Sequence, residues 1–312
     1  MKDVRDLAIA MGWGQINVQG SFDHSRVAVL LAAGYPDLVR SVVLADPFPV
    51  DAAWYDDRLS NFNAAWQAYY AACRADAACE RAFPNLEREQ AARYAERQQD
   101  PVVATVPDPA GGSDIDVMLN GDRSVDIRLQ GLSAQAILPI LAPLLVSPSF
   151  QTGANYVVQV SAPDPNGDPS GANFSAYCGD VDQRVVRGAL AATEALYPLF
   201  RVFAHDPLFE LCPRWPTQRS RGIQPLETAS AVPALILTGA LNPFAPPAYA
   251  QRAAKAFTHA TVAVFPSLTA LVLRDGPPCI SALRLAFLRD PNAKLDIEGC
   301  IAQVPPIAFA GT

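Results

Sequence analysis

The fold is decided by the stretch Ile16-Asn17-Val18-Gln19-Gly20-Ser21-Phe22-Asp23-His24-Ser25-Arg26 and the residues that follow it. Residues 16–19 form a short apolar run that Gly20 closes, which predicts a strand. Residues 25–33 are apolar and are followed by Gly34 and Pro36, which predicts a helix. Residues 41–46 are rich in β-branched side chains and predict a second strand. A strand, a helix and a strand at this spacing make a βαβ unit, so we expect a parallel sheet.

The α/β pattern stops after this unit and returns at Val232. Beyond that residue we expect strands at 234–238 and 261–265 and helices at 247–257 and 281–288. A further helix is expected at 3–11, before the first strand.

The segment between the two α/β parts has a different pattern. Helices are expected at 51–98, 132–145 and 182–203, and Pro/Gly/Asp-rich loops at 101–122 and 161–171. Pro139 and Pro143 should kink the second of these helices. We therefore predict a mostly parallel α/β sheet of about four strands with a mainly helical insertion. The predicted parts are a first core segment, a helical cap and a second core segment, at 1–49, 50–228 and 229–312.

Composition narrows the classes of partner. Half of the 312 residues are hydrophobic, 18% are charged, the net charge is −7 and the pI is about 5.0. Basic residues are dispersed, so we expect no nucleic-acid partner. The longest apolar runs, such as 136–146, are short and interrupted by proline, so no membrane span is expected. Residues 1–15 do not show the regions of a secretory signal, which leaves the location of this chain open.

Six cysteines make an even set, which favours disulfides and an exported protein over buried thiols. They are Cys73, Cys79, Cys178, Cys212, Cys279 and Cys300. Cys73 and Cys79 would be about 9 Å apart along a straight helix, so they can pair only if the helix breaks near residues 75–77. None of the six lies in a CxxC or Cys/His pattern, so no structural metal is expected, and no motif indicates a cofactor.

Functional groups of an open α/β sheet collect at the carboxyl ends of the strands. The strand, turn and helix at 18–27 stand where α/β-hydrolases place a nucleophile elbow. Such a turn is sharp, and small residues flank the nucleophile.

Sequence motifs along most of the chain are similar to one hydrolase family. The motifs are residues 12–20, 26–28, 35–44 and 72–79, Cys212 with Trp215, residues 235–239, Asn242-Pro243, Pro246-Pro247, Phe265-Pro266 and residues 276–279. Their order and spacing resemble the actinobacterial, secreted tripeptidyl-aminopeptidase-like hydrolases of the proline-iminopeptidase clan. The resemblance implies an α/β-hydrolase fold with an inserted cap, and a Ser-Asp-His triad.

This chain departs from the family at all three triad positions. The elbow Gly-Gly-Ser-Tyr-Gly-Thr-Arg of the family corresponds to residues 20–26, so Phe22 takes the place of the serine. Asn242 stands at the position of the acid and Ala270 at that of the histidine. A phenyl ring has no lone pair to attack a carbonyl, and alanine offers no base. The resemblance therefore predicts a fold whose usual mechanism is lost.

Neighbouring residues offer few substitutes. Ser21 and Ser25 flank the elbow and are interpreted as turn or cap serines. Asp23 would act as a nucleophile only after a one-residue shift of the elbow, and the consecutive Asp23, His24 and Ser25 face different directions on a helix start. His205 in the cap and His259 in a loop are the other histidines, and both are interpreted as structural or solvated side chains. We expect Ser21, Phe22 and Asp23 to line the former active-site pocket.

Members of this family carry further strands before the elbow strand, whereas only residues 1–15 precede it here. The strand near Ile16–Gln19 should then have an unpaired apolar edge, which invites association. A shortened N-terminus, a homodimer or a partner chain at that edge would each account for it.

We expect a hydrolytically inactive α/β-hydrolase homologue that keeps a cap-covered pocket for a small molecule or peptide. One alternative is a non-hydrolytic enzyme, such as a cyclase, isomerase or lyase, that uses Asp23, His24 or His205 for proton transfer. A second is a residual peptidase or esterase of the family. A third is a structural protein that acts through the open sheet edge.

Overall fold

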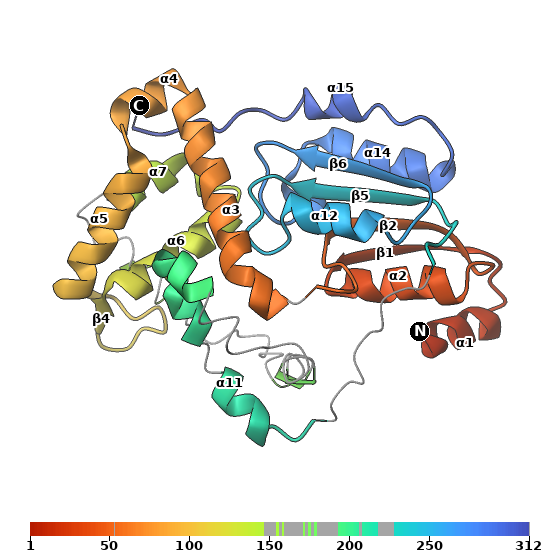
Figure 1. Ribbon diagram of the computed structural model, residues 1–312, viewed down its shortest axis with the longest axis horizontal. Coiled ribbons are helices and arrows are strands. Elements are labelled where there is room, and N and C mark those ends of the chain that lie inside the picture. Colours follow the sequence, from red (N-terminus) through yellow and green to blue (C-terminus); the bar gives the residue numbers. More distant parts are fainter. Residues whose placement is uncertain are drawn as a thin grey trace. The chain divides into compact units, whose positions relative to one another are not determined.

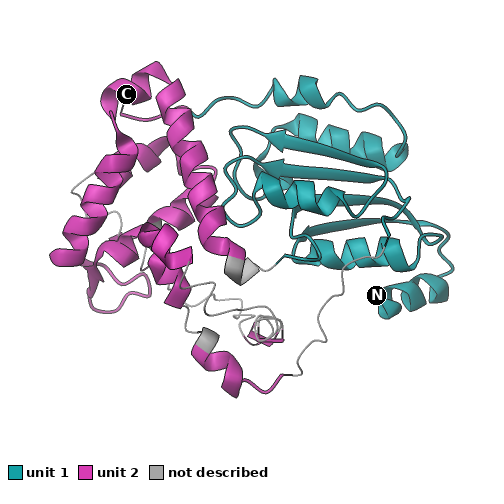
Figure 2. Cartoon of the chain, viewed as in Figure 1, with its two compact units in different colours: residues 1–54, 223–307 teal, residues 55–222, 308–312 magenta. Residues whose placement is uncertain are grey.

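The computed structural model describes residues 1–52, 54–146, 154–155, 158, 171, 174–175, 178–179, 193–205, 208–217 and 228–311, and the structural statements below concern these residues. The chain divides into two compact units (Figure 2). The first comprises residues 1–54 and 223–307, and the second comprises residues 55–222 and 308–312. The loop predicted at 161–171 and the helical pattern at 182–192 lie almost wholly outside the described residues.

The first unit contains a parallel four-stranded sheet, as predicted. Its order is β1 (Ile16–Phe22), β2 (Val39–Pro47), β5 (Ala234–Gly239) and β6 (Ala260–Phe265). Each strand pairs in parallel with its neighbour, from Ile16↔Val39 at one edge of the sheet to Gly239↔Phe265 at the other. The carboxyl ends of all four strands therefore meet at one edge, where the loops that follow them come together.

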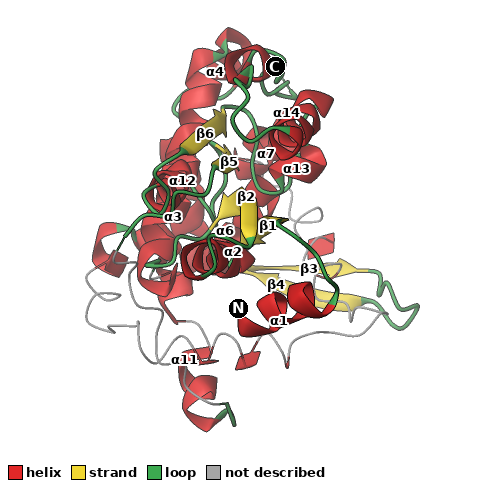
Figure 3. Ribbon diagram, turned by 90° about the vertical axis from the view of Figure 1, so that its right-hand side faces the viewer, coloured by secondary structure: helices red, strands yellow, loops and turns green. Residues whose placement is uncertain are grey.

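Helices cover both faces of this sheet (Figures 1 and 3). The helices of this unit are α1 (Lys2–Ala10), α2 (His24–Gly34), α12 (Pro247–Ala254), α13 (Val272–Asp275), α14 (Pro278–Arg289) and α15 (Ile297–Ile301). Side chains such as Leu44 and Ile236 pack with α2 and α12, whereas Val43 and Leu237 pack with α13, α14 and α15. Burial on both faces explains why β2 and β5 are nearly continuous apolar runs.

The second unit is mainly helical. Its described helices are α3 (Trp54–Ala75), α4 (Ala77–Ala82), α5 (Leu86–Gln99), α6 (Gly121–Ser133), α7 (Leu138–Val146), η1 (Pro198–His205), α11 (Leu208–Leu211) and η2 (Cys212–Arg214). The C-terminal segment belongs to this unit, where Tyr69 packs against Phe309 and Ala310 donates a backbone hydrogen bond to Pro139.

Two predictions for this unit were wrong. Residues 101–122 are not a loop, because β3 (Val102–Val106) and β4 (Ile115–Leu119) form an antiparallel hairpin. The Pro, Gly and Asp residues are concentrated in its turn, while Val106 and Leu119 are buried on one face. Residues 132–145 are not one kinked helix, because α6 ends at Ser133 and α7 begins at Leu138. Pro139 then lies in the first turn of α7, where proline is well tolerated.

All six cysteines are paired, as Cys73–Cys79, Cys178–Cys212 and Cys279–Cys300. The expected helix break lies at Asp76, whose carboxylate accepts hydrogen bonds from the backbone N–H groups of Ala78 and Cys79 at the start of α4. In the part of the chain that the structure describes, no helix combines enough length with enough apolar character to span a bilayer.

Candidate functional site

The turn after β1 has the geometry of a sharp strand-to-helix elbow. β1 ends at Phe22, whose backbone is left-handed with φ 48°, and α2 begins two residues later. A Cβ atom on Gly20 would lie 2.7 Å from the Cα of Ser25 and 2.9 Å from the backbone oxygen of His24. The strand and the helix approach this closely because residue 20 has no side chain.

Phe22 occupies the tip of the elbow with an aromatic ring that is partly buried. Its ring packs edge-on against Phe48 with the ring centroids 6.0 Å apart, and Phe48 in turn packs against Tyr249 at 5.8 Å. The backbone oxygen of Phe22 accepts a 3.0 Å hydrogen bond from the N–H of Phe48. The residue at the elbow tip therefore contributes apolar packing and no nucleophilic atom.

The two serines of the elbow have different surroundings. Ser25 is fully buried, and its hydroxyl is directed to the carbonyl oxygens of Phe48, at 2.8 Å, and Phe22. That arrangement ties the start of α2 to the segment after β2 and leaves the hydroxyl pointing inward. Ser21 is a partly buried residue of β1 and lies opposite Ala45 of β2.

Asp23 and His24 form a pair on the surface. The Asp23 carboxylate accepts a 3.0 Å hydrogen bond from the backbone N–H of His24, and it lies 3.1 Å from the His24 Nδ1 atom. Their side chains are 54% and 84% exposed, respectively, whereas Ser25 is buried. The three consecutive residues thus place their side chains in two different environments.

Asn242 lies in the loop after β5 and is fully buried. Its amide nitrogen donates a 2.9 Å hydrogen bond to the carboxylate of Asp46, at the carboxyl end of β2. Its amide oxygen accepts from the backbone N–H groups of Phe244 and Ala245, both at 3.0 Å. Asn242 therefore uses both ends of its amide to hold the loop in place.

Asp46 is the acidic residue at this edge that the sequence interpretation did not select. It is 1% exposed, has a φ of 50°, and also accepts from the N–H of Val272, at 3.1 Å, and the Thr238 hydroxyl, at 3.4 Å. Burial raises the pKa of Asp46 to about 6, although the hydrogen bonds from Val272 and Asn242 act in the opposite direction. The position of Asp46 at the carboxyl end of a buried, β-branched strand is the sequence feature that could have identified it as a site residue.

Ala270 lies in the loop after β6, which is bound to the loop after β5. The N–H of Leu241 donates to the backbone oxygen of Leu268 at 3.0 Å, and the Thr269 hydroxyl donates to the backbone oxygen of Leu241 at 3.2 Å. A Cβ atom on Gly239 would lie 2.2 Å from the backbone oxygen of Thr269, so a glycine is needed at this approach. Ala270 itself is 5% exposed.

These contacts bring the loops that carry the three positions to one edge of the sheet. The ring of Phe22 packs against Phe48, which directly follows β2. Asp46 at the end of β2 is hydrogen-bonded to Asn242. The loop that carries Asn242 is in turn hydrogen-bonded to the loop that carries Ala270. A carboxyl group is present at this edge, but the three positions themselves supply neither a hydroxyl nor an imidazole.

The other two histidines lie elsewhere. His259 is exposed, and its backbone oxygen accepts from the N–H of Ala234, which places it at the amino end of β6. His205 belongs to the second unit, is also exposed, and lies 3.3 Å from the carboxylate of Glu194. Within the described ranges, no cluster of three or more His, Cys, Asp or Glu side chains is arranged to hold a metal ion.

Comparisons with known proteins agree with the class of fold. Residues 197–300, about a third of the chain, match the α/β-hydrolase family model described as "TAP-like protein". The match includes β5 and β6, whereas β1 and β2 of the same parallel sheet lie outside it. A search of curated protein sequences returned no match.

Several solved structures share low sequence identity with this chain. An α/β hydrolase from a Medee basin deep-sea metagenome library is 13% identical over 95% of this chain and 72% of its own, with a TM-score of 0.35. A meta-cleavage product hydrolase from Pseudomonas fluorescens is 12% identical over 93% of this chain and 70% of its own, with a TM-score of 0.36. An epoxide hydrolase from Bacillus megaterium is 11% identical over 92% and 74%, also with a TM-score of 0.36.

Proposed function

We propose that this protein is an α/β-hydrolase homologue without the Ser-Asp-His triad, and that it binds a small molecule or peptide without hydrolysing it. The observation that carries the proposal is the elbow. Its left-handed backbone is present at residue 22, but that residue is a phenylalanine packed against Phe48.

The chemistry of the surrounding residues supports this proposal. Acyl transfer needs a nucleophile, a base that takes its proton and a group that orients the base. Phe22 is not a nucleophile and Ala270 is not a base. Both ends of the Asn242 amide already make hydrogen bonds, one to Asp46 and the other within its own loop. Ser25 is held by two carbonyl oxygens at the turn.

The test is covalent labelling with a fluorophosphonate, followed by assays with nitrophenyl esters and aminoacyl amides. We expect no labelled peptide and hydrolysis no faster than in the presence of heat-denatured protein. An active serine hydrolase serves as the positive control for the probe, and Ser21→Ala and Ser25→Ala variants serve as site controls. Stoichiometric labelling that either variant abolishes would show that a flanking serine is a nucleophile.

A second candidate function is a non-hydrolytic reaction, such as cyclisation, isomerisation or elimination. The exposed Asp23–His24 pair favours it, because a carboxylate 3.1 Å from an imidazole nitrogen is an arrangement that transfers protons. Incubation with candidate metabolites and product analysis, with His24→Gln as the comparison, separates this reaction from simple binding. Turnover that is unchanged in His24→Gln would exclude the pair.

We also propose that the protein belongs to the secreted, actinobacterial type of this family. Three disulfides and no free cysteine support an oxidising compartment. Thiol titration of protein isolated under acid quench is expected to find no free thiol before reduction and six after it. A reduced protein in freshly quenched cells would contradict the proposal.

A second copy of this chain is the partner that we propose for β1. In the described part of the chain β1 pairs only with β2, so its outer edge offers unpaired backbone groups. Under a two-fold axis one strand edge pairs with its own copy in antiparallel orientation, which joins two sheets into one.

A further inference from the structure

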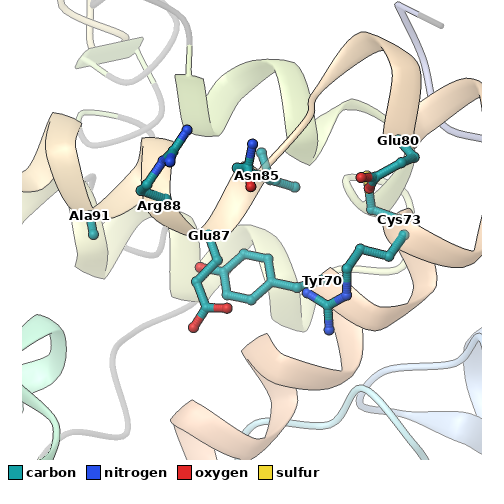
Figure 4. Close-up of a pocket in the computed structure, with 9 residues that line it drawn as sticks. Tyr70, Cys73, Glu80, Asn85, Glu87, Arg88 and Ala91 are labelled. Atoms are coloured by element: carbon teal, nitrogen blue, oxygen red, sulfur yellow. The ribbon is translucent and has the colours of Figure 1, made fainter.

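A cavity of about 290 Å³ opens in the helical unit where α3, α4 and α5 meet (Figure 4). Tyr70 and Cys73 reach it from α3, Glu80 from α4, and Glu87 and Arg88 from α5. It shares no residue with the positions after β1, β5 and β6. Its ligand therefore has to be inferred from its own walls.

The base of this cavity is apolar and its shape is fixed covalently. Tyr70, Cys73 and Leu86 line it and are 2%, 1% and 5% exposed, respectively. The Cys73–Cys79 disulfide joins the last turn of α3 to α4, so the two helices cannot move apart at this point. The cavity is therefore expected to be preformed, which lowers the entropic cost of binding.

Charged side chains of both signs surround this apolar base. Arg74, Glu80, Glu87 and Arg88 all line the cavity and are exposed. Across the described residues, no ion pair joins any of the four. Glu87 accepts a 2.6 Å hydrogen bond from the side-chain amide of Gln67. Two cationic and two anionic groups thus lie around one cavity without neutralising one another as close pairs.

Tyr70 adds a polar atom at the base. Its ring stacks on Trp66 with the centroids 5.7 Å apart, and its hydroxyl is buried with no hydrogen-bond partner among the described residues. Burial, and then the charge of Glu87, raise the pKa of Tyr70, so the hydroxyl stays a neutral donor. In Figure 4 the ring extends toward Glu87.

We propose that this cavity binds a small zwitterion of the free amino acid class. Its apolar part would lie on the base formed by Tyr70, Cys73 and Leu86, and its carboxylate and ammonium groups would lie among the arginine and glutamate side chains. A volume of about 290 Å³ lies at the lower end of the roughly 300–1,000 Å³ of ligand pockets, which suits a single amino acid better than an extended peptide. The proposal deepens the ligand-binding role given above and rests on it.

A ligand with a single charge fits the same walls less well. An anion would pair with the two arginines but would be repelled by the two glutamates. A cation would pair with the glutamates but would be repelled by the arginines. Only a molecule that carries both charges can satisfy both sets, and charge-assisted hydrogen bonds are the stronger kind. Specificity is then expected to depend on the presence of both groups in one ligand.

The test is calorimetric titration of the whole chain with L-alanine, L-leucine and L-glutamine. We expect saturable binding of at least one of them. N-acetyl-L-leucine keeps only the carboxylate and L-leucinamide only the ammonium group, and each is expected to bind at least about tenfold more weakly than L-leucine. Absence of saturable binding for all three amino acids would overturn the proposal, as would equal binding of either single-charge analogue.

Variants then connect binding to this cavity. Arg74→Gln and Glu80→Gln are exposed substitutions that should leave folding intact and weaken binding about tenfold or more. Arg81→Gln is the matched control, because Arg81 is exposed on α4 and does not line the cavity. Unchanged binding in both lining variants would assign the ligand to another site. Fluorophosphonate labelling reports on serines of the other unit, so this proposal and the absence of hydrolysis fail separately.

Discussion

Asp46 shows how one buried carboxyl group can set a measurable pH dependence. The side-chain amide of Asn242 and the backbone N–H of Val272 both donate hydrogen bonds to it. Such donors favour the ionised carboxylate, but burial at 1% exposure disfavours it more strongly, so the pKa rises from 3.8 to about 6. The folded protein therefore binds a proton here more tightly than the unfolded chain does.

The sign of the effect on stability follows from this difference. The contribution of Asp46 to stability is fully present below pH 3.8 and is lost as the pH rises through 6. The full loss amounts to roughly 3 kcal/mol. We predict that Asp46→Asn reduces the change in unfolding free energy between pH 4.5 and pH 7.5, measured by urea denaturation, by about 2 kcal/mol.

An exposed carboxyl provides the control for this measurement. Asp37 is exposed, and Asp37→Asn should leave the pH profile within about 0.5 kcal/mol of that of the unmodified protein. If the free energy of unfolding changes by the same amount in Asp46→Asn and in the unmodified protein between pH 4.5 and pH 7.5, Asp46 does not titrate in this range.

At the scale of elements, the elbow depends on the contact between β1 and α2. The Cβ that Gly20→Ala introduces would meet the backbone of Ser25 at 2.7 Å, and backbone atoms cannot rotate away as a side chain can. We predict that this substitution lowers the free energy of unfolding by about 1–3 kcal/mol, because the strand or the helix has to shift. Urea denaturation followed by far-UV circular dichroism measures the loss.

Gly34→Ala is the comparison at the other end of the same helix. A Cβ there has no atom within 4 Å, and Gly34 is the last residue of α2. This change should stay within about 0.5 kcal/mol of the unmodified protein. Equal stabilities for the two variants would mean that the approach at Gly20 is looser than its geometry indicates.

The strands that the sequence predicted most clearly are β2 and β5, which bury both of their faces. β2 and β5 are continuous apolar runs, and the turn at Gly34 and Pro36 marks the end of α2, so pattern and punctuation agree. The β3–β4 hairpin was missed because only one face is buried, and the Pro, Gly and Asp residues of its turn dominate the segment. The short helices α13 and α15 were not predicted, because each is too short to show a full helical period of apolar residues.

The candidate site was only partly predictable, because some of its contacts join residues that are far apart in the sequence. The resemblance to the hydrolase family pointed to Phe22, Asn242 and Ala270, and the loops that carry these residues lie at one sheet edge. Asp46 was missed because its importance comes from Asn242, which lies 196 residues further along the chain. Side-chain pairs at such separations leave no local pattern, and a single sequence does not reveal them.

For the whole molecule, the candidate interface is the outer edge of β1 and the residues that precede this strand. The outer edge of β1 has no strand partner in the described part of the chain. Just before it, large apolar side chains are exposed: Leu7 at 53%, Ile9 at 68%, Met11 at 58% and Trp13 at 51%. Single exposed apolar residues are common, but four of them within the seven residues that shortly precede a strand with an unpaired edge favour an interface.

Replacing two of these side chains by lysine tests the proposed pairing with a second copy. We predict that the unmodified protein dimerises with increasing concentration in sedimentation velocity, and that Leu7→Lys/Ile9→Lys raises the dissociation constant at least about tenfold, because two buried apolar contacts are replaced by charges. Met118→Lys is the control, since Met118 is 61% exposed on β4, which belongs to the second unit. A protein that stays monomeric at every concentration, or a double variant that associates like the unmodified chain, would exclude a second copy as the partner of β1.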